Sequence, residues 1–407
     1  METVKIAILG FGTIGSGIAE VLEKQKLLIT ARTGKVFEVT KILDVRDFSL
    51  HPMSDRFVKS IDDIINDNSI KIVAEAIGGT EPAFEYVMKC IKSEKHVVTS
   101  NKELVASKGI EILRAADDAG TGFLFEASVG GTMPIISAMA GVLSANTIEH
   151  IDGILNGTTN FILTNMLQKK LSFDEALERA QQLGYAETID PSADIDGIDA
   201  GRKIAILASL AYGGQFPVDK VSIEGIRGIT YDDLALADAA GGAVKLIASA
   251  DGSEFGDVRA RVMPMFVYKT NRLAFVDDVF NMVSLKCNMS GAVEIFGRGA
   301  GKLPTAAVVV GDIIELATKV IDRPAFWTGH VNAVEEHDDI LGRYFATVTS
   351  DDKELLESIR VKVDAVCSNE RGVGFVTSNI TGAEARLLEG KLKKHGPSVR
   401  LFSILQD

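Results

Sequence analysis

Residues 4–17 read VKIAILGFGTIGSG. A short apolar run of strand length is followed by glycines spaced G-x-G-x-x-G, and then by a stretch of helical periodicity. In this setting Gly10 permits a tight turn, Gly12 lets the backbone approach a pyrophosphate, and Gly15 lets the helix pack on the strand. A bound anion would lie at the helix N-terminus, where N–H groups point outward. The stretch therefore predicts a dinucleotide-binding strand–helix unit.

Strands and helices continue to alternate after this unit. Buried-type strands are expected over 37–43, 71–77, 96–99 and 122–125, with helices from 83 and over 103–119. This alternation predicts an α/β fold with a doubly wound parallel Rossmann sheet. Ligands of such sheets bind at the carboxyl ends of the strands, where Thr80, Ser100 and Lys102 fall. Lys102 is interpreted there either as a functional cation or as a surface lysine that opens a helix.

The end of the second strand carries conflicting signals for the cofactor. Asp44 is placed to hold the adenosine ribose hydroxyls, which favours NAD. Arg46 and Lys59 favour the 2′-phosphate of NADP. Each of the three is equally well explained as a solvated loop charge. We expect NADP or NAD, with NADP slightly favoured.

The composition is that of a globular protein with an acidic balance. Of 407 residues, 46% are hydrophobic and 24% charged, and the net charge is −13. This balance disfavours nucleic acid and anionic membranes as partners. We find neither an apolar run of the ~18 residues that a membrane span needs nor a secretory signal. Cys90, Cys287 and Cys367 are far apart and predict reduced thiols, so we expect a cytoplasmic protein.

The segment 184–203, GYAETIDPSADIDGIDAGRK, places five carboxylates before a lysine. Asp199 and Lys203 are four residues apart, so they share one face of a helix. A lysine in an apolar helix beside carboxylates is typical of a proton donor or of a clamp for an amino acid. An acidic helix start with an ordinary ion pair gives the same spacing, so both interpretations stay open from these residues alone.

Two turns and the C-terminal region complete the pattern. Residues 156–160, between a strand over 148–155 and a helix over 161–169, either bind a small polar ligand or are plain turn residues. A glycine-rich flexible loop over 297–305 precedes an apolar helix. The region from 343 onward has the pattern strand, helix, strand, strand, helix, strand, which predicts a small α+β unit.

Six motifs together resemble one family, homoserine dehydrogenase, over about residues 4–322. The motifs are GFGTIGSG (10–17), SNKELVAS (100–107), EASVGGTMPII (126–136), ILNGTTNFIL (154–163), GYAETIDPSADIDGIDAGRKIAILA (184–208) and GAGKLPTA (299–306). The long acid–lysine motif is the specific one, because other Rossmann enzymes share the glycine motif.

The resemblance implies an enzyme that interconverts L-aspartate 4-semialdehyde and L-homoserine with NADPH or NADH, in threonine, methionine and isoleucine biosynthesis. Lys203 and Lys102 would be its catalytic lysines. We expect Lys203 to donate the proton that the developing alkoxide needs, and Lys102 to hold the substrate or polarise its oxygen; exchanged roles stay open. The substrate-binding residues implied are Glu187, Asp194, Asp199, Gly157, Thr158 and Tyr185. The cofactor-binding residues expected from the motifs and the resemblance are Gly10, Gly12, Thr13, Ile14, Gly15, Arg46, Thr80, Ser100, Lys102 and Gly301.

The resemblance also implies a monovalent cation, usually sodium. The residues that match its ligands, mostly through backbone carbonyls, are Glu126, Val129, Gly131 and Met133. A homodimer is expected from the resemblance and because closed two-fold dimers are the commonest assembly. The expected domains are a Rossmann domain over 1–134 and 302–325, a mixed α+β substrate-binding and dimerisation domain over 135–301, and a small α+β ACT-like module over 340–407. The module lacks the usual Asp-x-Pro-Gly turn, so we expect weak or no inhibition by threonine.

Two other functions would need different residues. A semialdehyde dehydrogenase that oxidises the aldehyde needs a thiolate nucleophile beside a base, and neither Cys90 nor Cys287 stands at a strand-to-helix turn with a histidine. A non-catalytic amino-acid sensor would predict damaged catalytic positions. Both lysines and the acids are present, so the dehydrogenase is the favoured hypothesis.

Overall fold

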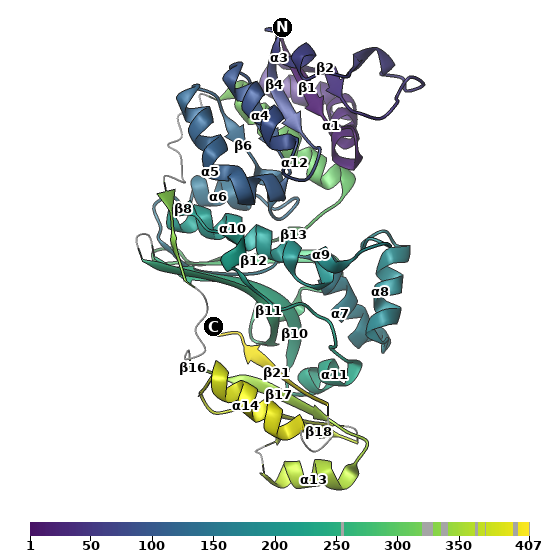
Figure 1. Ribbon diagram of the computed structural model, residues 1–407, viewed down its shortest axis with the longest axis vertical. Coiled ribbons are helices and arrows are strands. Elements are labelled where there is room, and N and C mark those ends of the chain that lie inside the picture. The colour runs from purple at the N-terminus through teal and green to yellow at the C-terminus, as the bar shows by residue number, and fades with distance from the viewer. Residues whose placement is uncertain are drawn as a thin grey trace.

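Three parts follow one another along the long axis of the computed structural model (Figure 1). The structure describes residues 1–253, 256–319, 329–334, 341–362, 365–370, 372–393 and 398–406. The ends of two predicted domains, residues 320–325 and 340, lie outside the described residues. Across these described ranges, no helix has the length and apolar character needed to cross a bilayer.

The N-terminal part contains a six-stranded, all-parallel sheet in the order β3-β2-β1-β4-β5-β6. The strands are β1 (Glu2–Leu9), β2 (Lys35–Leu43), β3 (Phe57–Val58), β4 (Ile70–Glu75), β5 (His96–Thr99) and β6 (Phe123–Leu124). The strand order reverses at β1, and ligands of such sheets bind at this point, outside the carboxyl ends of β1 and β4. The predicted α/β class with a doubly wound parallel sheet is confirmed.

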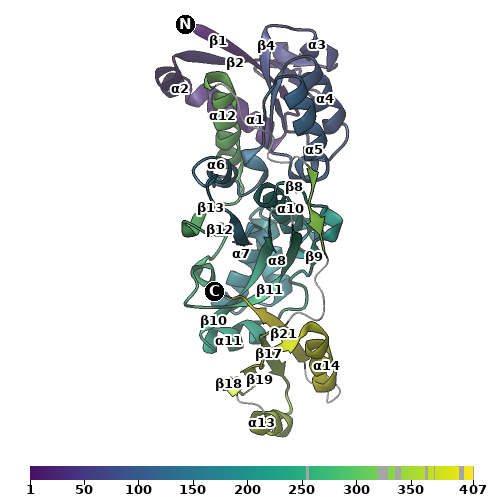
Figure 2. The ribbon, with the colours of Figure 1, turned by 90° about the vertical axis from the view of Figure 1, so that its left-hand side faces the viewer.

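Helices cover both faces of this sheet, because alternate side chains of each strand point to opposite faces. The helices are α1 (Thr13–Lys24), α12 (Lys302–Thr318), α4 (Ala83–Lys92) and α5 (Lys102–Asp118). Ile6 and Ile8 of β1 pack in the core with α1 and α12, whereas Ala7 and Leu9 pack in the core with α4 and α5. Figure 2 shows α12 returning to lie beside α1, although almost 300 residues separate them along the chain.

Close contacts around the glycine motif leave no room for a Cβ at several of its positions. Gly10 has a φ of +87°, and a Cβ on Gly15 would lie 1.9 Å from the Gly10 carbonyl oxygen. A Cβ on Gly17 would lie 2.9 Å from the Cβ of Ala306 in α12. Nothing lies within 4 Å of the position of a Gly12 Cβ, so the surface above this residue is open.

The middle part is built on a second sheet in the order β13-β12-β7-β10-β11. Its strands are β7 (Ile148–Ile154), β10 (Gly242–Gly252), β11 (Asp257–Tyr268), β12 (Phe280–Cys287) and β13 (Gly291–Arg298). The helices α7 (Gly157–Lys169), α10 (Ile198–Tyr212) and α11 (Tyr231–Ala239) pack on the sheet. The sequence patterns did not identify β10 or α11, and β13 takes in the first two residues of the loop predicted over 297–305.

Two helix predictions in this part were wrong at their starts. The helix predicted over 161–169 begins at Gly157, because the side chain of Asn156 caps it by accepting from the Thr159 N–H. The acidic segment is not one helix start: a short helix α9 (Ser192–Ile195) ends before Gly197, whose φ of +84° reverses the chain into α10.

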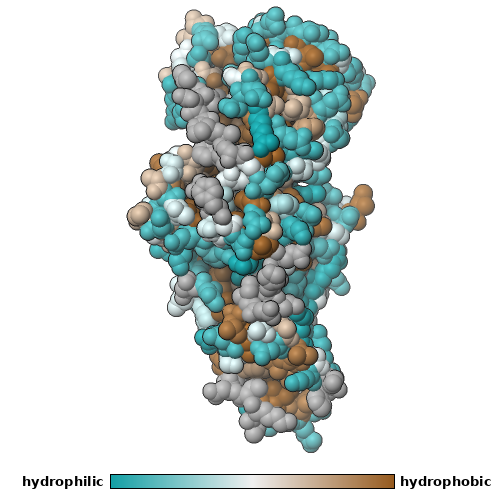
Figure 3. Space-filling model, turned by 60° about the vertical axis from the view of Figure 1, so that its left-hand side comes forward, coloured by the Kyte–Doolittle hydropathy of each residue, from teal (hydrophilic) through white to brown (hydrophobic). Residues whose placement is uncertain are grey.

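The C-terminal unit extends the second sheet. Its elements are β17 (Tyr344–Thr349), α13 (Lys353–Lys362), β18 (Ala365–Asn369), β19 (Gly372–Val376), α14 (Gly382–Lys393) and β21 (Ser398–Ile404). The strands pair in the antiparallel order β21-β17-β19-β18, and β21 pairs in parallel with β11. Hydrophobic side chains gather over this lower end of the molecule (Figure 3), and Leu341 and Leu387 are exposed there. The resemblance of this unit to ACT modules stays a prediction.

Candidate active site

The site lies where the N-terminal and middle parts meet, with α10 beside α5 (Figures 1 and 2). Asp199, in the first turn of α10, is buried at its centre. Its Oδ2 accepts from Lys203 Nζ at 2.7 Å, and its Oδ1 accepts from Lys102 Nζ at 2.8 Å. One carboxylate thus joins the two predicted catalytic lysines, which come from different parts of the molecule.

The loop after β7 holds the other side of this cluster. The Leu155 carbonyl accepts from Lys203 Nζ at 2.7 Å. The Asn156 side-chain amide donates to Asp194 Oδ1 at 2.7 Å and to Asp199 Oδ2 at 3.0 Å. The opposite end of the same amide caps α7. Asn156 therefore fixes two acids relative to the helix, a role that sequence reasoning missed; an asparagine directly before a helix, at a capping position, was the available signal.

The two acids differ in their electrostatic surroundings. Burial alone would raise the pKa of Asp199, but the charges of Lys203 and Lys102 outweigh it and hold that pKa below its ordinary range. The Asp199 charge in turn raises the pKa of Lys102. Asp194 behaves oppositely: its burial, together with the nearby Asp199 charge, raises its pKa. The site therefore contains a permanent ion-paired carboxylate beside one that is harder to ionise.

The remaining substrate candidates lie at the outer side of this cluster. The Thr158 hydroxyl, buried in the first turn of α7, donates to the Tyr185 carbonyl at 2.7 Å. The ring of Tyr185 packs edge-on against Phe161. Gly157 lies so close to the Val279 carbonyl that a Cβ would approach it to 2.8 Å. Glu187 is exposed in the irregular loop 184–190, where its carbonyl accepts from Gln181, so the structure does not bring its carboxylate into the buried cluster.

The predicted cofactor residues border the carboxyl edge of the parallel sheet. Gly10 directly follows β1, and Gly12 directly precedes α1, whose first residues are Thr13, Ile14 and Gly15. The first amides of a helix have no partner within it and point outward, so this arrangement fits a pyrophosphate. Three further candidates stand in the loops that follow β4 and β5 and before α12: Thr80, Ser100 and Gly301.

Asp44 and Arg46 form one unit rather than two separate signals. The Asp44 Oδ1 accepts from Arg46 N and Nε at 2.9 and 3.0 Å. Its Oδ2 accepts from Arg46 Nη2 at 2.8 Å and from the Phe11 N–H at 2.7 Å. These bonds, first of all those of the Arg46 side chain, hold the pKa of Asp44 well below its ordinary range. The carboxylate is buried and its acceptor positions are occupied, while the Arg46 side chain is 57% exposed.

The turn predicted to hold a monovalent cation runs from Glu126 to Met133. The carboxylate oxygens of Glu126 accept from the N–H groups of Ile136 and Ser137 at 2.8 and 2.6 Å, so they cap the short helix α6 (Ile135–Ala140). The oxygen donors left to a cation are backbone carbonyls, including those of Val129 and Gly131, and such hard donors suit sodium. Sodium binding stays a prediction.

The cysteine chemistry of the alternative hypothesis finds little support. Burial raises the pKa of the Cys90 thiol to about 12, so it stays protonated at neutral pH. Burial also raises the pKa of Cys287. Both cysteines are therefore poor nucleophiles.

Comparison with known proteins places these features in one family. A family model described as homoserine dehydrogenase, NAD binding domain, matches residues 10–126, and one described as homoserine dehydrogenase matches 134–314. A homoserine dehydrogenase of Synechocystis sp. is 44% identical over 320 residues, which are 77% of this chain and 73% of that protein. A homoserine dehydrogenase structure from Thiobacillus denitrificans has a TM-score of 0.87 at 32% identity, covering 100% of this chain and 99% of that one.

A hyperthermophilic archaeal homoserine dehydrogenase in complex with NADPH has a TM-score of 0.65 at 30% identity, covering 77% of this chain and 98% of that one. The family model for the NAD-binding domain supports a nicotinamide cofactor. The resemblance predicted from the six motifs is confirmed. The chain belongs to the homoserine dehydrogenase family and is an NAD(P)-dependent oxidoreductase that acts on a CH–OH group.

Proposed function

We propose that the chain interconverts L-aspartate 4-semialdehyde and L-homoserine, with Lys203 as the proton donor and Lys102 as the cation that orients the reacting oxygen. The observation that carries this proposal is the single carboxylate of Asp199 between the two ammonium groups, at 2.7 and 2.8 Å. It holds both lysine side chains at one point of the junction between the sheet edge and α10.

The chemistry divides between the cofactor and the chain. When bound, the nicotinamide supplies the hydride that reduces the aldehyde carbon. The aldehyde oxygen then gains negative charge and needs a positive charge and a proton. Among the described residues, Asp199 and Leu155 take two of the three N–H donors of Lys203. The third is left to donate to the substrate oxygen.

Lys102 suits an electrostatic role. It is the first residue of α5, after the carboxyl end of β5, at the sheet edge where the cofactor is expected. Its pKa is raised by Asp199, so it keeps its proton over the neutral range and is a weaker acid than an ordinary lysine. A fixed cation that does not give up its proton stabilises developing negative charge without entering the proton transfer.

The substrate's ammonium group needs a different acid. Asp199 already accepts from Lys102, Lys203 and Asn156. Asp194 accepts from Asn156 through Oδ1, and a bound ammonium would restore the ionised form that burial disfavours. We therefore assign Asp194 to the ammonium, with Glu187 of the neighbouring exposed loop as its partner if that loop closes over the substrate.

The Asp44–Arg46 unit supports NADP as the preferred cofactor. A ribose diol needs a carboxylate with open acceptor positions, and those of Asp44 are occupied by Arg46 and the Phe11 N–H. The Nε and Nη2 edge of Arg46 is bound to Asp44, and the exposed outer end of the guanidinium, with Nη1, is left to donate to a 2′-phosphate.

Arg46→Ala is expected to reverse this preference. Loss of a charge-assisted contact should lower kcat/KM for NADP about 10- to 100-fold, and the freed Asp44 should raise kcat/KM for NAD. The measurement is absorbance at 340 nm with homoserine and each cofactor, with Lys24→Ala as a surface control. An unchanged NADP-to-NAD ratio would contradict the assignment, and no turnover of folded wild-type protein with either cofactor would contradict the proposed function itself.

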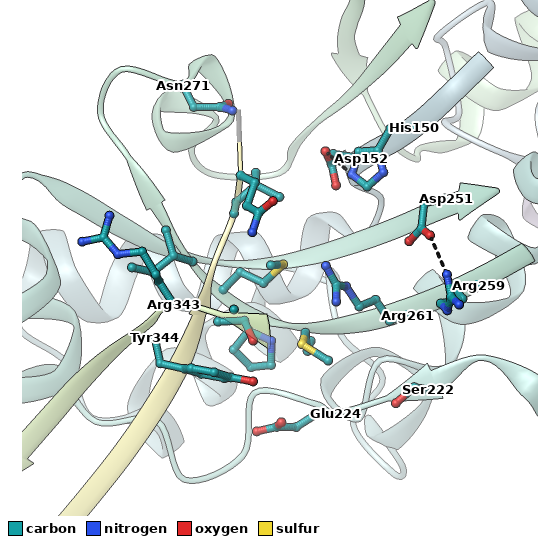
Figure 4. Close-up of a pocket in the computed structure, with 18 of the residues that line it drawn as sticks. His150, Asp152, Ser222, Glu224, Asp251, Arg259, Arg261, Asn271, Arg343 and Tyr344 are labelled. Atoms are coloured by element: carbon teal, nitrogen blue, oxygen red, sulfur yellow. Dashed lines mark ion pairs between the residues drawn. The ribbon is translucent and has the colours of Figure 1, made fainter. Parts of the chain in front are cut away.

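The open face of the second sheet supports a homodimer. A groove of about 1540 Å³ runs along this face between the sheet and the C-terminal unit (Figure 4). Along β11, buried residues alternate with Arg259, Arg261 and Met263, which line the groove. A two-fold interface brings a surface against its own copy, so charged groups in it are matched only where the surface carries both signs of charge. The groove carries both signs: Asp251 pairs with Arg259 at 3.5 Å, and Glu224 also lines it.

Arg261→Glu is expected to weaken this dimer, because it removes the positive partner of the opposing copy's acids. Sedimentation velocity should show wild-type protein as a dimer and the variant shifted toward monomer at micromolar concentration. Lys24→Glu, on the nucleotide-binding part, serves as the charge-matched control. A monomeric wild type, or a variant that dimerises like wild type, would rule out this surface.

A further inference from the structure

A buried carboxylate at the carboxyl edge of the first sheet takes no part in the reaction proposed above. Glu75 is the last residue of β4 and is 0% exposed. Its Oε2 accepts from the Thr99 hydroxyl at 2.5 Å, and its Oε1 accepts from the Ile77 N–H at 2.7 Å. Burial raises its pKa. Burying an acid is unfavourable in free energy unless hydrogen bonds offset it. A buried acid therefore suggests that its hydrogen bonds have a role that an apolar side chain would not fill.

These hydrogen bonds tie together the loops that follow β4 and β5. The Thr99 hydroxyl, which donates to Glu75, also accepts from the Asn101 N–H at 2.9 Å. The Asn101 side-chain amide donates to the Gly79 carbonyl at 2.7 Å and lies 3.5 Å from Glu75 Oε1. Asn101 is therefore held from its backbone and from its side chain, and both connections lead to the same carboxylate.

Asn101 in turn sets the start of α5. Its Oδ1 accepts from the Leu104 N–H at 3.1 Å, which makes it the N-cap of the helix. Lys102 is the first residue of that helix, so its backbone position follows directly from the cap. From there its Nζ crosses to Asp199 of α10 at 2.8 Å.

We propose that Glu75 is a positioning residue for Lys102. Acting through Thr99 and Asn101, it fixes the N-terminus of α5 so that the Lys102 ammonium meets Asp199 and the substrate oxygen at one point. The proposal rests on the role given to Lys102 under the proposed function. It assigns Glu75 no contact with substrate or cofactor.

A double-mutant cycle on the full-length protein tests it. Glu75→Gln keeps the side chain's shape but has one acceptor oxygen for two sets of donors. We expect kcat to fall about tenfold through misplacement of Lys102, and rates are measured at saturating NADPH so that a change in cofactor affinity does not enter kcat. In a Lys102→Ala background, Glu75→Gln should change kcat by less than twofold, because the group that it positions is gone.

The outcomes separate the two claims. If the Glu75→Gln effect persists at full size without Lys102, or if Glu75→Gln alone leaves kcat unchanged, the positioning role is overturned while the function of Lys102 stands. If Lys102→Ala has wild-type kcat, the proposed function of Lys102 fails, and the positioning role fails with it.

Two further variants guard against a folding defect. Thr99→Val breaks the same chain of contacts at its middle and should reproduce the loss of kcat and its disappearance in the Lys102→Ala background. Asp233→Asn changes another buried carboxylate, which binds the Thr347 hydroxyl far from the site. Its effect on kcat, if any, should be the same with and without Lys102.

Discussion

Lys203→Ala is expected to lower kcat by about 10³-fold while the protein stays folded and binds NADPH normally. The loss combines a hydrogen bond to the developing alkoxide, typically worth 10²–10³-fold, with the proton that the same nitrogen delivers. The fold should tolerate the change, because Asp199 keeps Lys102 at 2.8 Å and Asn156 at 3.0 Å as partners. The cofactor edge is untouched, because Lys203 belongs to α10.

Steady-state rates at 340 nm and NADPH fluorescence titration check this expectation. Lys203→Arg is the informative companion, since it keeps the positive charge but has a pKa too high to release a proton. It should recover part of the electrostatic effect and little of the turnover. A Lys203→Ala enzyme within tenfold of the wild-type rate would show that Lys203 is structural and that the proton comes from elsewhere.

The residues that meet at the site were predictable only where they belong to local patterns. The strand–glycine–helix unit and the pairing of Asp199 with Lys203 follow from spacings of a few residues. That Asp199 also holds Lys102, almost 100 residues earlier, depends on how α5 and α10 pack at the junction of two parts. No local spacing contains that contact.

The lack of a distinctive local pattern also explains why β10 was missed. β10 is a central strand, buried over most of its length between β7 and β11. Its run of apolar residues lacks the strict alternation that marks a half-exposed strand, and a short apolar run also fits a buried helix. Asp44 and Arg46 give competing signals in the sequence for a related reason: the three hydrogen bonds between them depend on the side-chain geometry of the loop after β2.

Asp199→Asn should show how strongly the site depends on one charge. The substitution keeps the shape of the side chain but leaves Lys203 and Lys102 close together without their shared counter-charge. Removing one member of a buried ion pair costs about 3 kcal/mol or more, so the melting temperature should fall and kcat should drop by about 10²-fold. A kcat that changes less than threefold would contradict the bridging role.

The pH dependence of this variant gives the sharper test, because the direction of each shift is fixed. In the wild type Asp199 raises the pKa of Lys102, so the stabilising pair is complete below the ordinary lysine pKa and is lost only as the pH rises through the raised value. Asp199 itself has a lowered pKa, so its contribution is present above the ordinary carboxyl pKa and is lost as the pH falls through the lowered value.

Without the carboxylate, burial and the neighbouring cations lower the pKa of Lys102, and the alkaline limb of kcat/KM should move down by about one pH unit or more. Rates should be measured from pH 6 to 10.5 in wild type, Asp199→Asn and Asp196→Asn. Asp196 is a half-buried acid of the same segment and pairs with Arg227, so this control separates the effect from a general loss of negative charge. An alkaline limb that stays in place would contradict the dependence of turnover on the Asp199 charge.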